Sequence, residues 1–167
     1  SKLSIDCDSY YSDLTIDSGF INNGTIELDA LNGNYSSSLT ITNGTLINAT
    51  NGLFQTKNST GGTRSFTGKM ENHGTLKLDN NFSVSSSSFV NDTTGIINGS
   101  KTLSLTGTNL ENNGTISPGT SPGTLTLNGG NLVNTSASNF NVEIGGYTAG
   151  TEFDKLIIQN TANLSGN

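Results

Sequence analysis

An asparagine recurs along this chain at a nearly constant spacing, each time two residues after an apolar side chain. Six copies of this apolar–x–Asn pattern end at Asn22, Asn48, Asn72, Asn91, Asn112 and Asn134, so the successive steps are 26, 24, 19, 21 and 22 residues. A period of this length is typical of repeat architectures, in which each repeat stacks on its neighbours. We therefore expect a solenoid with one coil per asparagine.

Each asparagine is followed by a short turn and then by a second apolar residue. Three copies share the string N-x-G-T before Ile or Leu, at residues 22–26, 72–76 and 112–116. We expect the second apolar residue to open a further strand at Ile26, Leu53, Leu76, Ile96 and Ile116. A seventh copy is expected at Leu164-Ser165-Gly166, where the asparagine is missing.

Short runs that alternate apolar and polar residues indicate strands and not helices. Examples are LTID at 14–17, LTIT at 39–42 and LSLT at 103–106. Such alternation buries one side of a strand. Asn, Thr and Ser supply 70 of the 167 residues, and all three are poor in helix interiors. The 40 Leu, Ile, Val and Phe residues are numerous and regular enough to exclude disorder.

These features predict an all-β fold, namely a single-stranded right-handed parallel β-helix with about seven coils of roughly 22 residues. We expect one domain over residues 1–167, with coils over 1–134 and a last coil or cap over 135–167. A β-sandwich is the alternative, because turns every 8 to 12 residues or so suit it. A sandwich gives no reason for an asparagine in register in every coil.

The six asparagines are expected to form a structural ladder. The apolar residue and the asparagine two positions later point to the same side of a strand, so both face the core. A stacked asparagine can then bond its amide to the coils above and below, as in the amide ladders of cross-β stacks. We interpret Asn22, Asn48, Asn72, Asn91, Asn112 and Asn134 in this way and not as a binding site.

Charge and cysteine content argue against several classes of function. The net charge is −6 and no stripe of Lys or Arg is present, which argues against nucleic acid as a partner. No apolar run approaches the roughly 18 residues of a membrane-spanning helix, so we expect no direct membrane insertion by this segment. Cys7 is the single cysteine, so no disulfide is expected.

The C-terminal third carries strings that are similar to those of a known group of proteins. The strings are NNGTISPGTSPGTLTLNGG (112–130), NFNVEIGG (139–146), GTEFDKLIIQ (150–159) and ANLSG (162–166). They resemble the β-helix repeats of bacterial autotransporter passengers and filamentous haemagglutinin-like adhesins. The resemblance implies that the chain is a segment of a longer exported protein, secreted or at the cell surface and built for adhesion, display or spacing, and it names no ligand.

The string SPGTSPG predicts a corner. Pro118 and Pro122 each fix φ and remove a hydrogen-bond donor, while Gly119 and Gly123 permit a positive φ. Two tight turns in succession are expected, and their role is structural.

Two segments depart from the repeat, at 53–66 and 135–153. Insertions in a solenoid form loops on one face, which is often the binding face. Candidate contacts with a sugar or protein ligand are the four tyrosines and two basic residues: Tyr10, Tyr11, Tyr35, Lys57, Arg64 and Tyr147.

The residues do not predict catalysis or a cofactor. Ser-His-Asp, Cys-His and phosphate-loop patterns are absent from the sequence, and His73 occupies a turn position. Asp6 and Asp8, two residues apart, are a weak candidate site for Ca²⁺, and so are Glu152 and Asp154. Two carboxylates are too few to specify such a site. We therefore expect no enzyme, no cofactor and no assigned metal.

Two functions remain open at the level of sequence. One is an adhesin segment that contacts glycans, matrix proteins or neighbouring cells through its loops. The other is a passive stalk that displays another domain. A polysaccharide-acting enzyme is a distant third, because it needs carboxylates gathered on one face. All three imply an extracellular or bacterial cell-surface location.

Overall fold

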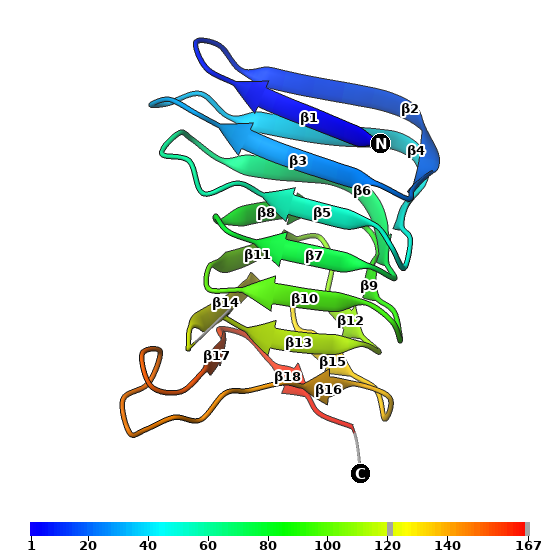
Figure 1. Cartoon of the computed structure of the whole chain (residues 1–167). Helices are drawn as coiled ribbons and strands as arrows, with labels where there is room; N and C mark the ends of the chain where they lie inside the picture. Colours follow the sequence, from blue (N-terminus) through cyan, green and yellow to red (C-terminus); the bar gives the residue numbers. More distant parts are fainter. Residues whose placement is uncertain (120–121, 166–167) are drawn as a thin grey trace.

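The computed structural model describes residues 1–119 and 122–165. Within them the chain is all-β and its strands stack in parallel into a β-solenoid of about six turns (Figure 1). The strands at the front of Figure 1 run to the left, and the chain returns behind them one step lower, which is a right-handed winding. The predicted parallel β-helix is confirmed, and the β-sandwich is wrong.

Each coil has three faces, which we call face 1, face 2 and face 3 in chain order. Face 1 is a seven-stranded parallel sheet in the described residues. Its strands are β1 (Lys2–Cys7), β3 (Thr25–Ala30), β5 (Leu53–Thr56), β7 (Thr75–Leu78), β10 (Ile96–Gly99), β13 (Thr115–Pro118) and β16 (Asn139–Phe140).

Faces 2 and 3 belong to one larger sheet, which is bent along a line parallel to the solenoid axis. In the first three coils one long strand crosses both faces, and its pairing shifts register at the bend: β2 (Ser12–Asn22), β4 (Ser37–Asn48) and β6 (Arg64–Asn72). In later coils the strand divides. Face 2 then holds β8 (Phe82–Ser85), β11 (Thr102–Thr106), β14 (Thr124–Gly129) and β17 (Lys155–Ile158), and face 3 holds β9 (Phe89–Asn91), β12 (Leu110–Asn112), β15 (Leu132–Asn134) and β18 (Ala162–Asn163).

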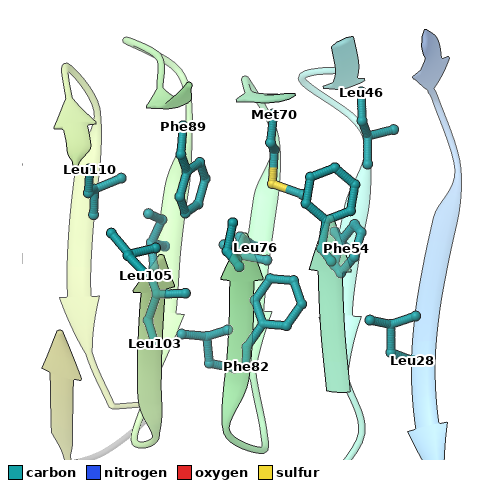
Figure 2. Packing of buried hydrophobic residues seen from close by; sticks show 14 of the residues in the cluster. Leu28, Leu46, Phe54, Met70, Leu76, Phe82, Phe89, Leu103, Leu105 and Leu110 are labelled. Atoms are coloured by element: carbon teal, nitrogen blue, oxygen red, sulfur yellow. The ribbon is translucent and has the colours of Figure 1, made fainter. Parts of the chain in front are cut away.

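The core is a set of columns of apolar side chains that run from coil to coil. On face 3, Leu46, Met70, Phe89 and Leu110 follow one another in register (Figure 2). Phe54 packs edge-to-face on Phe66 at 6.3 Å and tilted on Phe82 at 5.4 Å between ring centroids. Each such side chain, once fully buried, contributes about 1.5–3 kcal/mol, so the columns are the main source of stability.

The six asparagines lie in register at the end of face 3 and form a continuous ladder. Each side-chain Nδ2 donates to Oδ1 of the next asparagine, at 2.8 Å for Asn22–Asn48, 2.7 Å for Asn48–Asn72, 2.8 Å for Asn72–Asn91, 2.8 Å for Asn91–Asn112 and 3.1 Å for Asn112–Asn134. Nδ2 also donates to backbone carbonyls of the following turns, for example from Asn72 to Gly74 at 3.1 Å. All six are buried, with exposed fractions of 7% or less.

The predicted strand openings at Leu53 and Ile96 are confirmed, since β5 begins at Leu53 and β10 at Ile96, but neither residue belongs to the inward column. In the inward column of face 1, Ile26 is followed by Phe54, Leu76, Ile97 and Ile116. Leu53 is therefore half-buried and Ile96 is 39% exposed. The turns after Asn48, Asn91 and Asn134 are two residues longer than those after Asn22, Asn72 and Asn112, and two extra residues preserve the inward–outward alternation of the strand.

The predicted seventh copy of the repeat is also displaced. Strand β18 pairs Ala162 with Leu132 and Asn163 with Val133, so Ala162 and not Leu164 continues the apolar column. Leu164 stands two residues later, in line with the asparagines, and is 66% exposed. Gly166 lies outside the described residues.

The ladder yields a stability prediction. Replacing Asn72 by Leu leaves a donor on Asn48 and an acceptor on Asn91 unpaired in the core, and each unpaired group costs about 1–3 kcal/mol. We expect Asn72→Leu to lower the free energy of unfolding by about 2–4 kcal/mol in urea denaturation. Thr67→Ala, an exposed change in the same strand, should stay within about 0.5 kcal/mol of the parent. Equal stability of the two variants would refute the ladder's role.

Candidate functional site: the tyrosine cluster

The loops that join face 1 to face 2 lie along one edge of the solenoid, which we call the loop edge. Its segments include residues 8–11, 31–36, 57–63 and 141–154. They project on the left of Figure 1, the last in orange at the lower left. All four tyrosines of the chain lie in these segments, as does Lys57.

Three of the tyrosines form a cluster on the first two coils, here called the tyrosine cluster: Tyr10, Tyr11 and Tyr35. Tyr11 and Tyr35 meet edge-to-face with ring centroids 5.6 Å apart, and Tyr10 tilts against Tyr35 at 6.2 Å. Both geometries are favourable for aromatic pairs. Tyr10 is 81% exposed and Tyr11 is 65% exposed, so the rings pack on each other while most of their surface faces solvent.

Backbone hydrogen bonds between coils hold the cluster in place. Ser12 N donates to Ser36 O at 3.0 Å, and Gly62 N donates to Tyr35 O at 2.8 Å. The C-terminal end of segment 8–11 is therefore hydrogen-bonded to segment 31–36, and segment 31–36 is hydrogen-bonded to segment 57–63. The parallel stacking of the strands thus extends into the loops and brings together tyrosines that are 24 residues apart in sequence.

Arg64 is not a ligand contact, and that prediction is wrong. It aligns with the inward positions Ser37 and Phe82, and its exposed fraction is 1%. Alternation with Phe66 in the run RSF is the sequence signal that could have shown this, because residues two apart on a strand point to the same side.

The buried guanidinium of Arg64 donates hydrogen bonds to backbone carbonyls of the loop edge. Its Nη1 donates to Gly61 O at 3.0 Å and to Gly62 O at 2.5 Å, and its Nη2 donates to Ser59 O at 2.8 Å and to Ala30 O at 3.3 Å. Asp29 Oδ1 lies 3.7 Å from Nη2. Burial lowers the pKa of Arg64, while the charge of Asp29 raises it. Arg64 therefore fastens segment 57–63, and through it the support of Tyr35.

The remaining candidate contacts lie apart from the cluster. Lys57 is half-buried, and its backbone N donates to Leu28 O at 2.9 Å. Tyr147 is fully exposed in segment 141–154, near the C-terminal end. There Glu152 Oε2 accepts from the backbone N of Tyr147 at 3.0 Å and of Thr148 at 2.8 Å. The hydrogen bond from the Thr148 side chain, together with these two backbone bonds, lowers the pKa of Glu152.

The Pro–Gly string joins β13 on face 1 to β14 on face 2. Gly119 has a backbone φ of 99°, a value that residues with a side chain rarely adopt. Position 123 requires glycine for a different reason, because a Cβ there would collide with the Ser100 side chain. Pro118 is buried and Pro122 is half-buried. The buried Asp154 fixes the corner by accepting from Gly123 N at 2.8 Å and from Glu143 N at 2.9 Å.

The acidic pair Asp6 and Asp8 is exposed and its oxygens accept from neutral groups. Ser4 Oγ donates to Asp6 at 2.8 Å, and Asn32 Nδ2 donates to Asp8. Among the described residues, no three His, Cys, Asp or Glu side chains gather in a way that could hold a metal ion. His73 lies at the turn after Asn72, with Nδ1 2.9 Å from Asp92 Oδ2.

Sequence reasoning missed an open groove at the bend between faces 2 and 3. It has a volume of about 670 Å³, and a second depression of about 330 Å³ adjoins it through Ser87 and Gly107. Hydroxyls from successive coils form one wall: Thr40, Thr67, Ser85 and Thr106. Binding sites for small molecules are usually enclosed and lined by aromatic side chains, and this groove is open and has no aromatic side chain among those that line it, so it does not resemble one.

No protein-family model, no curated protein and no solved structure has a significant match to this chain. In the part of the chain that the structure describes, no helix is long and apolar enough to cross a membrane.

The position of Arg64 yields a second prediction. Arg64→Met leaves four carbonyls and Asp29 without their cation, and removing one partner of a buried ion pair typically costs about 3–5 kcal/mol. We expect a loss of this size in urea denaturation, and an intermediate loss for Arg64→Lys, whose ammonium cannot reproduce the guanidinium fork.

The matched control is Lys69→Met, a change of the exposed lysine in the same strand, which should leave stability nearly unchanged. If Arg64→Met were as stable as Lys69→Met, the fastening role of the guanidinium would be wrong.

Proposed function

We propose that this chain is a segment of an exported bacterial surface protein that adheres to a partner through the tyrosine cluster. The observation that carries the proposal is that two exposed tyrosines, Tyr10 and Tyr11, both pack on the half-buried Tyr35 at one place on the loop edge. Exposed aromatic groups of this size are enriched in interfaces because they bury much area at little conformational cost. The likeness of residues 112–166 to adhesin repeats supports the same function.

The scaffold also supports this function. The core columns run from coil to coil and the asparagine ladder joins the first six coils, so the loop edge rests on a rigid rod. Binding groups that are held in place before the partner arrives lose less entropy on binding. Tyr35, whose carbonyl is bonded to the next coil, supplies a fixed ring on which Tyr10 and Tyr11 rest.

A passive stalk is the second candidate, and the outer surface of face 2 favours it. The outward residues there form two hydroxyl columns: Ser38, Ser65, Ser83 and Ser104, and Thr15, Thr40, Thr67, Ser85 and Thr106. Such neutral columns offer little to a partner. In a stalk the tyrosine cluster would have no ligand.

The two candidates are separated by an array of glycans and matrix proteins probed with folded chain. We expect saturable binding to one ligand class, weakened at least about tenfold in the double variant Tyr10→Ala/Tyr11→Ala, because central aromatic residues each contribute more than 1 kcal/mol or so at interfaces. Tyr147→Ala is the matched control, since it removes an equally exposed but isolated tyrosine. No binding at all, or equal loss in both variants, would favour the stalk.

A further inference from the structure

The net charge of this chain is concentrated in its first two coils. Residues 1–35 contain six acidic residues and one lysine, a net charge of −5, whereas the rest contains seven acidic and six basic residues, a net charge of −1. The first two coils therefore hold nearly all of the net −6. The tyrosine cluster belongs to these same two coils.

Two of the six carboxylates are neutralised within the structure. Glu27 Oε2 lies 2.5 Å from Lys2 Nζ, and the hydrogen bond to Lys2 lowers the pKa of Glu27. Asp29 faces the buried Arg64 at 3.7 Å. These two acids therefore add little to the field outside the molecule.

The other four carboxylates have no cationic partner within the described residues: Asp6, Asp8, Asp13 and Asp17. All four are exposed, and their hydrogen-bond donors are neutral. Ser38 Oγ donates to Asp13 at 2.6 Å, and Thr42 Oγ1 donates to Asp17 at 2.8 Å. Their negative charge can therefore interact with a cationic group on another molecule.

These carboxylates surround the tyrosines along the chain, in the run DCDSYYSDLTID from residue 6 to residue 17. Aromatic rings attract cations through their faces, and Arg and Lys are the side chains that most often use this contact. Uncompensated carboxylates add attraction for the same charge and repel anions. Rings and carboxylates together select a cationic group.

We propose that the tyrosine cluster binds a lysine- and arginine-containing polypeptide segment. The spread of the carboxylates favours a peptide over a single amine, since Asp13 and Asp17 alone are about 13 Å apart along an extended strand. Several cations in a row match that spread, with one of them on the rings of Tyr10 and Tyr11. This inference rests on the proposed adhesive function and names its partner.

The test is a titration of the full chain, at low ionic strength, with a fluorescent peptide of alternating Lys and Ser. A Glu–Ser peptide of equal length, an amino-sugar oligomer and its N-acetylated form serve as comparison ligands. We expect binding of the Lys–Ser peptide alone, with affinity that falls as salt is added. Each lost ion pair should cost about two- to fivefold, so Asp8→Asn/Asp13→Asn should weaken binding about four- to twenty-fivefold. Tyr10→Leu/Tyr11→Leu should weaken it at least about threefold.

The matched control is Glu111→Gln/Glu143→Gln, which removes two exposed charges outside the first two coils and should change affinity less than twofold. An equal loss in this control would show diffuse attraction and overturn the proposal. Binding of the amino-sugar oligomer without the peptide would overturn the partner class. Tyrosine-dependent binding of a neutral or acidic ligand on the array would overturn this inference and leave the adhesive function standing, whereas absence of any ligand would remove both.

Discussion

One buried amide per coil is the constraint on which the rest of this structure depends. An asparagine in an apolar core is costly unless its donor and acceptor are both bonded. In the four interior members of the ladder both groups are bonded to the asparagines of the neighbouring coils, at 2.7–3.1 Å. If a coil slipped by one residue, its asparagine would leave the ladder and a residue from an outward-facing position would take its place. One amide donor and one amide acceptor of the neighbouring asparagines would then be unpaired. The ladder thus sets the register of face 3, and through it the stacking of the whole solenoid.

Because the ladder fixes the register of face 3, coils of different length differ in the turns and loops between their strands. The turn after the asparagine takes two extra residues after Asn48 and Asn91, and the loop edge takes segments 31–36 and 57–63. Function can therefore change at the loop edge without disturbing the core. The tyrosine cluster lies where the chain is free to vary, yet it rests on bonded coils and on the buried Arg64.

The parallel β-helix and the asparagine positions could be predicted because both depend on period and alternation, which are visible in a single sequence. Phe54 and Ile97 were missed because turn length cannot be read from an isolated repeat. Arg64 was misplaced because charge normally indicates exposure, and only its alternation with Phe66 showed otherwise. The contact of Tyr11 with Tyr35 and the groove at the bend depend on how coils align in space, so no local pattern could predict them.

Hydrogen exchange of side-chain amides, followed by NMR, tests the central role of the ladder most directly. The account predicts that the Nδ2 protons of the interior members Asn48, Asn72, Asn91 and Asn112 exchange as slowly as core backbone amides, because they open only when coils separate. The exposed Asn32 and Asn43 should exchange rapidly. Rapid exchange of the four ladder amides in an otherwise protected solenoid would contradict the account.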